Sequence, residues 1–339
     1  MSSTRVVNKE PIKVVFWDLD GTLWSGTLGE DSASDIVPHP EVLATLHELD
    51  SRGILNSLVT QAAFDIAQSH LKAIGLHELF VQPMYAVGSK ARAIASSLTA
   101  LHLLPINAAF IDDQSFHLEE VKALLPEVLV LPAQQAAKLS THPRFQVSSV
   151  LGSSRRRMMQ AETKRGAAEN VFAGDRGEFL QACQMVLTCR RAQPEDMLRF
   201  KELLQRAHQF SANGPYVLSS NGRFHIGELK DRYGDYGLVA AAVVEDSINA
   251  NQPICFQLAI SCRVQGRGVV ESFLRWLVNA EGKNLAIHTA VTPVNRPLRT
   301  ALRLCGFSKI DACDNEELLQ LMRPELLRYP FWMRVTEGK

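Results

Sequence analysis

The stretch that decides the fold is residues 14–31, which read Val-Val-Phe-Trp-Asp-Leu-Asp-Gly-Thr-Leu-Trp-Ser-Gly-Thr-Leu-Gly-Glu-Asp. The apolar run Val14 to Trp17 is too short for a helix and is followed by a glycine turn, so it predicts a buried strand. Asp18 and Asp20 follow it, at the strand end where open α/β sheets bind ligands. Since side chains two apart on a strand share a face, we expect both carboxylates to point the same way. Such a pair favours a bound Mg²⁺, with one Asp as nucleophile and the other moving the proton.

Other predicted strands and helices also end or begin at a chemically useful group. Thr60 follows the predicted strand 54–59, Lys90 opens the predicted helix 90–101, and Asp112 and Asp113 end the predicted strand 108–111. With further helices at 38–53, 63–74 and 115–124 and a strand at 128–131, the alternation predicts βαβ units and a parallel sheet. The hydroxyl and the ammonium are expected to hold phosphoryl oxygens, and the acidic pair to hold the metal. Taken singly, each has a plainer interpretation: a strand-end cap, a solvated helix start, and an acidic turn.

The bulk composition describes an ordinary globular chain. It has 339 residues, of which 46% are hydrophobic, and a formal net charge of +0. The length predicts about two domains, and the zero net charge argues against nucleic acid or a membrane surface as partner. The six cysteines lack Cys-x-x-Cys spacing, the N-terminus lacks a signal-like apolar run, and no stretch is long enough to span a bilayer. We therefore expect free thiols and a cytoplasmic location.

Residues 133–175 are rich in Ala, Gln, Ser and basic side chains, including Arg155, Arg156 and Arg157. They predict either a solvated connector or a docking patch for an acidic carrier protein. The expected division is a first domain at 1–135, a helical connector at 136–185 and a second domain at 186–339. From residue 223 the pattern is rich in predicted strands, which indicates a mixed α/β second domain.

A glycine-rich turn marks the second domain. Residues 261–268 read Ser-Cys-Arg-Val-Gln-Gly-Arg-Gly, between a predicted strand at 254–260 and a predicted helix at 269–280. Backbone amides at such a turn favour an anion, which gives Arg263, Gly266 and Gly268 a binding role. Cys262 is either a small core residue or, with a pKa lowered by Arg263 and the helix N-terminus, a nucleophilic thiolate.

The run Lys230 to Asp235 holds charges of both signs within six residues. One interpretation is a hairpin turn with solvated charges. The other is a polar wall that binds a small hydroxy acid or phosphate, in which Arg232 clamps the anion and Asp231 or Asp235 orients it.

The acidic motif Asp-x-Asp-Gly-Thr at 18–22, followed in order by Thr60, Lys90 and Asp112-Asp113, resembles the motif set of haloacid dehalogenase-like (HAD) phosphohydrolases. The glycine turn with Asn295 and Gly306-Phe307 resembles the Gcn5-related N-acetyltransferase (GNAT) fold. With the stretches at 23–31, 209–210, 229–238 and 261–263, residues 12–335 resemble the FkbH-like proteins of polyketide biosynthesis. The resemblance implies an α/β fold: an N-terminal HAD-like Rossmannoid parallel sheet with a minimal cap, a small flap at 25–37, and a C-terminal GNAT-like mixed α/β domain.

The resemblance also implies an activity. An FkbH-like enzyme takes a glyceryl unit from D-1,3-bisphosphoglycerate, removes phosphate and loads the unit through a cysteine thioester onto the phosphopantetheine arm of an acyl carrier protein. The implied catalytic residues are Asp18, Asp20, Thr60, Lys90 and Cys262, and the implied Mg²⁺ ligands are Asp18, Asp20, Asp112 and Asp113. The implied substrate-binding residues are Asp231, Arg232, Asp235, Arg263, Gly266, Gly268 and Asn295.

The chain departs from the family at two places. Residues 208–211 read His-Gln-Phe-Ser where family members usually have Asn-Gln-Phe-Asn, which puts one polar contact in doubt. FkbH-like proteins usually carry Ser-Lys-Asn-Asp after the second strand, whereas residues 60–63 read Thr-Gln-Ala-Ala. The hydroxyl is kept and the neighbouring charges are not, which leaves a different donor open. Three alternatives remain: a small-molecule phosphatase with a non-catalytic second domain, a coenzyme A-dependent acyltransferase, and a non-enzymatic scaffold.

Overall fold

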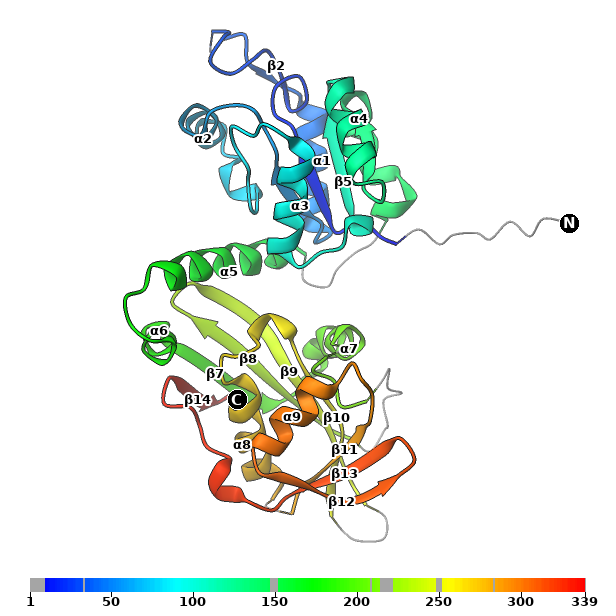
Figure 1. The fold of residues 1–339 in the computed structure, drawn as a ribbon, viewed down its shortest axis with the longest axis vertical. Helices are drawn as coiled ribbons and strands as arrows, with labels where there is room; N and C mark the ends of the chain where they lie inside the picture. Colours follow the sequence, from blue (N-terminus) through cyan, green and yellow to red (C-terminus); the bar gives the residue numbers. More distant parts are fainter. Residues whose placement is uncertain are drawn as a thin grey trace, which may run out of the picture. The chain divides into compact units, whose positions relative to one another are not determined.

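The computed structural model describes residues 10–32, 34–146, 152–207, 209–213, 222–247, 252–282 and 284–338. The chain divides into two compact units, Met1–Thr163 and Lys164–Lys339 (Figure 1). The boundary falls inside helix α5 (Ser154–Val171), so the expected connector at 136–185 is shared between the units. Among the described residues, no helix is long and apolar enough to cross a membrane.

Unit 1 is built on a parallel four-stranded sheet in the order β4-β1-β5-β6, as the sequence predicts. The strands are β1 (Val14–Trp17), β4 (Leu55–Leu58), β5 (Ala108–Asp112) and β6 (Leu129–Pro132). The helices between them are α1 (Pro40–Ser51), α2 (Phe64–Ala73), α3 (Lys90–Leu101) and α4 (Ser115–Leu124). Because all four strands run the same way, the residues that follow β1, β4 and β5 meet at one edge.

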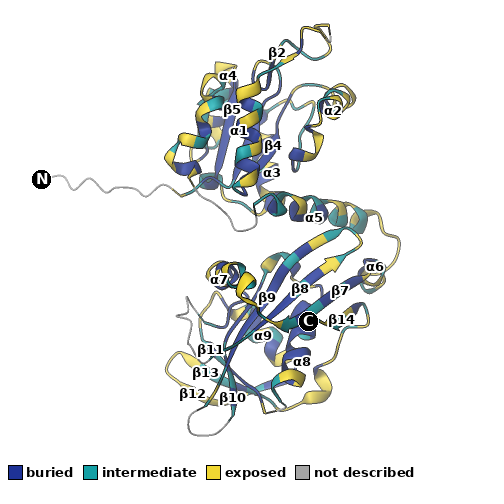
Figure 2. Ribbon diagram, turned by 180° about the vertical axis from the view of Figure 1, so that it is seen from behind, coloured by how far each residue is buried: buried dark blue, intermediate teal, exposed yellow. Residues whose placement is uncertain are grey.

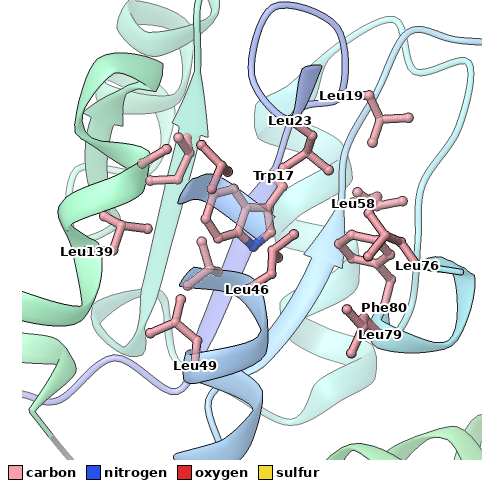
Figure 3. Packing of buried hydrophobic residues seen from close by; sticks show 14 of the residues in the cluster. Trp17, Leu19, Leu23, Leu46, Leu49, Leu58, Leu76, Leu79, Phe80 and Leu139 are labelled. Atoms are coloured by element: carbon pink, nitrogen blue, oxygen red, sulfur yellow. The ribbon is translucent and has the colours of Figure 1, made fainter. Parts of the chain in front are cut away.

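The strand β1 is buried on both faces, which explains its unbroken apolar sequence. Trp17 packs in one apolar cluster with Leu46 and Leu49 of α1, and Phe16 packs in the cluster on the opposite face (Figure 3). The indole of Trp17 donates a hydrogen bond of 2.9 Å to Oδ1 of Asn56, which is itself fully buried. This polar link joins β1 to β4 inside the core.

A small flap rises from the sheet edge. The two-residue strands β2 (Trp24–Ser25) and β3 (Val37–Pro38) pair antiparallel and enclose the residues between them. This is the minimal cap that the sequence predicts, and it lies at the same end of unit 1 as α2 (Figures 1 and 2).

The basic segment after β6 packs against unit 1. The 3-10 helix Ala133–Thr141 contacts α1, where Thr45 donates a hydrogen bond to the carbonyl of Ala137. Farther along, the Arg155 guanidinium donates to the Gly53 carbonyl at 2.7 Å, and Arg156 pairs with Asp50 at 2.9 Å. These two arginines anchor the start of α5 through contacts within unit 1.

Unit 2 holds an eight-stranded mixed sheet in the order β12-β13-β11-β10-β9-β8-β7-β14, which confirms the predicted mixed α/β architecture. Its strands are β7 (Met185–Arg191), β8 (Arg223–Asp231), β9 (Gly234–Asp246), β10 (Pro253–Ile260), β11 (Ala286–Ala290), β12 (Phe307–Cys313), β13 (Glu316–Leu321) and β14 (Met333–Glu337). Its remaining helices are α6 (Arg176–Ala182), α7 (Met197–Arg206), α8 (Val269–Glu281) and α9 (Arg296–Leu304).

The helices α7 and α8 cover opposite faces of the central strands. Phe200 of α7 packs with Ile226 of β8, while a Cβ added to the next residue, Gly227, would meet Phe273 of α8 at 3.1 Å. Figure 2 shows β9 buried over most of its length, and β8 is buried at residues 225–227. This two-sided burial agrees with the continuous apolar run that predicted β9.

The parallel strands β10 and β11 pair only near their starts, at Ile254 with Ala286 and Cys255 with Ile287. Farther along, residues 210–213 lie between them. The Ala212 N–H donates to the Leu258 carbonyl at 2.8 Å, and the Ala290 N–H donates to the Ala212 carbonyl at 2.9 Å. The chain's own backbone therefore fills the gap between the diverging strands.

Replacing Trp17 with Phe removes the indole donor and leaves Oδ1 of Asn56 buried without it. We expect the free energy of unfolding of unit 1 to fall by about 1–3 kcal/mol, the cost of an unsatisfied buried polar group. Urea unfolding of the full chain, followed by circular dichroism, measures this. A Trp17→Phe/Asn56→Leu double variant whose loss of stability equals the sum of the two single losses would contradict a coupling between the two side chains.

Candidate active site

The Lys90 ammonium lies at the centre of the site. Lys90 is the first residue of α3, and its side chain is only 2% exposed. Its Nζ lies 2.7 Å from Oδ1 of Asp18 and 2.6 Å from Oδ2 of Asp112. Since buried charges are tolerated only when they are paired, these contacts explain how an ammonium and two carboxylates are held in the interior. Three of the predicted residues thus meet as one group.

Backbone contacts fix the two carboxylates. The Asp18 N–H donates to the Ile111 carbonyl at 3.0 Å, which ties the residue after β1 to the end of β5. Oδ1 of Asp112 accepts a hydrogen bond of 2.8 Å from the Gln114 N–H at the start of α4. Both residues are buried, and the adjacent Asp113 is exposed. The site is therefore buried at Asp18 and Asp112 and open to solvent at Asp113.

The carboxylates of Asp18, Asp112 and Asp113 fit a divalent cation. Each offers one oxygen, and these atoms all lie within 4.8 Å of one another. Burial raises the pKa of Asp18 to about 7, with Lys90 opposing this shift and Asp112 adding to it. The pKa of Asp113 is also raised, by burial and then by Asp112. Three carboxylates facing one ammonium leave negative charge that a hard cation with oxygen ligands, such as Mg²⁺, would offset.

The side chain of Asp20 lies outside this metal group, contrary to its expected role as a ligand. Its Oδ1 accepts hydrogen bonds from the Trp24 indole at 2.8 Å and from the Leu28 N–H at 3.1 Å. The strand ends at Trp17, so the alternation of strand side chains does not extend to Asp20. The turn instead directs Asp20 toward Trp24 of β2, at the base of the flap.

Thr60 is buried, and its Oγ1 accepts a hydrogen bond of 3.1 Å from the Ala62 N–H. It therefore caps the turn after β4, as the plainer interpretation has it. Its O–H has no acceptor among the described residues, which leaves the proton available for a phosphoryl oxygen.

Two further neighbours of the site lie on α4, and the sequence pattern does not predict either of them. His117 is 4% exposed, and burial, followed by the charge of Lys90, lowers its pKa. Glu120 accepts a hydrogen bond of 2.5 Å from the hydroxyl of Ser89, the N-cap of α3. A histidine on the inward side of a helix is usual in cores, so only the fold places His117 beside the site.

In unit 2, Cys262 is exposed at the start of a short 3-10 helix, Cys262–Val264. The neighbouring Arg263 has Arg199, Arg206 and Glu202 of α7 as its electrostatic neighbours. Glu202 pairs with Arg199 at 2.9 Å and with Arg206 at 3.0 Å. The thiol therefore lies beside a cluster in which basic groups outnumber acidic ones.

The predicted anion turn is closely covered at one glycine. Gly266 and Gly268 have positive φ values of 71° and 86°. A Cβ on Gly268 would meet Cγ of Pro330 at 2.7 Å, and the Trp332 indole donates to the Arg267 carbonyl at 2.9 Å. Packing of the C-terminal segment is thus sufficient reason for glycine at position 268.

Other residues of unit 2 that the sequence predicts to bind substrate make contacts that stabilise the fold. Oδ1 of Asp231 accepts from the N–H groups of Tyr233 and Gly234, and Asp235 pairs with Lys230 at 2.9 Å. Arg232 lies over the Tyr233 ring in the same hairpin turn. Nδ2 of Asn295 donates to the carbonyls of Ala212 and Ala290. The hairpin interpretation of 230–235 therefore accounts for their contacts, and Asn295 closes the gap between β10 and β11.

No protein-family model and no curated protein matches the chain. Several solved structures are similar to part of it. A hypothetical protein from Xanthomonas campestris has 23% identity over 36% of this chain and 63% of its own, with a TM-score of 0.28. The N-terminal part of a Bacteroides fragilis protein, containing a phosphatase domain complexed with Mg, has 22% identity over 42% of each chain and a TM-score of 0.35.

For the Escherichia coli ribosomal-protein-S18-alanine N-acetyltransferase the identity is 15%, over 39% of this chain and 91% of that one, and the TM-score is 0.30. The chain spans less than two thirds of the Xanthomonas and Bacteroides chains. At these identities and TM-scores the likenesses carry no argument about activity, which rests on the geometry of the site.

Replacing Gly21 with Ala tests whether Asp113 is a ligand. A Cβ at position 21 would come within 2.5 Å of Oδ2 of Asp113, at a φ of +70°. Displacing the carboxylate should weaken Mg²⁺ binding about 10-fold to 100-fold, as measured by isothermal titration calorimetry. Gly75→Ala is the matched control, because its φ is +73° and its Cβ would meet nothing within 4 Å. Equal Mg²⁺ affinity in both variants would contradict the site.

The raised pKa of Asp18 predicts a pH dependence of stability. Its folded-state pKa of about 7 exceeds that of the unfolded chain, so its favourable contribution is present at low pH and is lost as the pH rises through about 7. In EDTA, the free energy of unfolding of wild type should fall relative to that of Asp18→Asn when the pH is raised from 4.5 to 8. This range is chosen because the Asp18 carboxyl titrates at about 4 in the unfolded chain and at about 7 in the folded chain. Urea unfolding at both pH values measures this, and identical pH profiles would contradict it.

Proposed function

We propose that unit 1 is a Mg²⁺-dependent phosphohydrolase that forms a phosphoaspartate on Asp18. The observation that carries this proposal is the contact of the buried Lys90 with both Asp18 and Asp112, beside the third carboxylate of Asp113. Lys90 occupies Oδ1 of Asp18, which leaves Oδ2 as the attacking oxygen. A structural ion pair alone would not require the third, exposed carboxylate at this position.

The chemistry follows from the placement of these groups. Oδ2 of Asp18 attacks phosphorus, the ester P–O bond breaks, and Asp20 gives its proton to the leaving alkoxide. Asp20 then takes a proton from water, which attacks the phosphoaspartate, releases inorganic phosphate and restores Asp18. Lys90 and the Thr60 hydroxyl stabilise the charge on the phosphoryl oxygens. Bound Mg²⁺, held by Asp18, Asp112 and Asp113, would neutralise the phosphoryl charge and the carboxylate it approaches.

The finer proposal concerns unit 2 and follows the FkbH-like resemblance. The Cys262 thiolate attacks the acyl carbon of D-1,3-bisphosphoglycerate, the acyl C–O bond breaks, and inorganic phosphate leaves. The thiol of a carrier protein's phosphopantetheine arm then displaces Cys262 and takes the three-carbon unit. The exposure of Cys262 and the nearby arginines support this step, because both donor and carrier arm bear phosphate.

A coenzyme A-dependent acyltransferase is the second candidate for unit 2. It would need the turn at 266–268 to receive a pyrophosphate. The contact of Pro330 and Trp332 with Gly268 favours the thioester proposal over this one, because part of the turn is covered.

Intact-protein mass spectrometry tests both half-reactions. The full chain is mixed with Mg²⁺, 1,3-bisphosphoglycerate and a holo acyl carrier protein. We expect a glyceryl mass on the carrier with wild type, a phosphoglyceryl mass with Asp18→Asn, and no acyl mass with Cys262→Ser. The exposed Cys313→Ser is the matched control and should behave as wild type. Phosphate release with no acyl gain on either protein would leave a phosphatase alone.

A further inference from the structure

A cavity of about 510 Å³ lies between the flap and α2. The flap contributes Leu28, Asp31 and Ile36, and α2 contributes Asp65, Ile66 and His70. Its lining has both polar and apolar side chains. Two of the lining residues are linked, directly or through Trp24, to Asp20, the proposed acid and base.

Two contacts join the cavity to the reacting groups. The N–H of Leu28, a lining residue, donates to Oδ1 of Asp20 at 3.1 Å. The Trp24 indole donates to the same oxygen and packs edge-on against the lining residue His70, with ring centroids 4.9 Å apart. These contacts place the wall of the cavity next to Asp20, the group that would protonate the ester oxygen of a substrate bound at Asp18.

The charge of the lining is negative. Asp31 and Asp65 are exposed carboxylates, and neither forms an ion pair with another described residue. Among the described residues that line the cavity there is no lysine or arginine. Burial lowers the pKa of His70, against the opposing charge of Asp20, so its ring does not offset the two carboxylates as a fixed positive charge would. The lining therefore repels a second anion.

The remaining lining suits an uncharged group with hydrogen-bonding atoms. Leu28, Ile36 and Ile66 supply apolar contact, and Ser69 supplies a hydroxyl. Nε2 of His70 is buried and has no hydrogen-bond partner among the described residues.

We propose that this cavity binds the part of the substrate beyond the ester oxygen, and that it selects phosphate esters with an uncharged remainder over esters that carry a second anion. This inference rests on the proposed function and deepens it. The bisphosphate donor and free 3-phosphoglycerate both carry a second anion at the acyl carbon. A 3-phosphoglyceryl thioester carries no charge there, and the pantetheine segment next to it is uncharged and bears amides. Acyl transfer therefore precedes removal of the ester phosphate.

Two probes isolate the charge: 3-phosphoglycerate and its N-acetylcysteamine thioester, which share the phosphate ester. With the full chain and Mg²⁺ at low salt, we expect kcat/KM for phosphate release to be about 10-fold higher for the thioester (~1.4 kcal/mol). The ratio should fall as salt is added. Asp31→Asn and Asp65→Asn should each reduce the ratio by raising turnover of 3-phosphoglycerate. Glu30→Gln, which removes an exposed flap carboxylate outside the lining, should keep the wild-type ratio.

Turnover of p-nitrophenyl phosphate separates the two possible failures, and it also shows whether each variant retains a working phosphate site. If wild type hydrolyses neither it nor the two probes, the proposed function fails. If wild type hydrolyses p-nitrophenyl phosphate and has the same kcat/KM for 3-phosphoglycerate and for the thioester, charge selection is overturned. A thioester preference that is unchanged in both Asp variants overturns the cavity as its source.

Discussion

The carboxylates that we propose to react in unit 1 are positioned by one buried ammonium, that of Lys90. Lys90 joins the turn after β1, the end of β5 and the start of α3 through its contacts with Asp18 and Asp112. Breaking a buried ion pair typically costs about 3–5 kcal/mol, because it leaves an uncompensated charge. The same contacts orient the proposed nucleophile, so the stability and the chemistry of this edge depend on the same side chain.

The charge balance of the edge then follows from topology. Parallel strands bring the residues after β1 and β5 together, and three carboxylates gather where there is one ammonium. The resulting excess of negative charge would favour a divalent cation, and the bound cation would in turn favour a phosphoryl group. The flap adds a second negative region at Asp31, beyond the reacting groups. On our proposal, one edge of the sheet holds a metal and phosphate site and, next to it, a pocket that selects the rest of the substrate.

The sequence was sufficient to predict the sheet and the meeting of Asp18, Lys90 and Asp112, because strand ends and helix starts follow from local apolar periodicity. It was not sufficient for Asp20, whose direction is set by a turn and by Trp24. It also missed β12 and β13, which are half-exposed strands with polar residues that carry little periodic signal. Asn295 looked like a ligand-binding residue, and only the tertiary structure shows its amide bound to the carbonyl of Ala212.

The central claim is that Asp18 accepts a phosphoryl group beside a Mg²⁺ ion and Lys90. Beryllium fluoride, which mimics a phosphoryl group on a carboxylate, tests it directly by ¹⁹F NMR of the full chain. If Asp18 accepts the phosphoryl group, bound fluoride should give resonances that require Mg²⁺ and are lost in Asp18→Asn. The absence of bound resonances in wild type, or their persistence in Asp18→Asn, would contradict it.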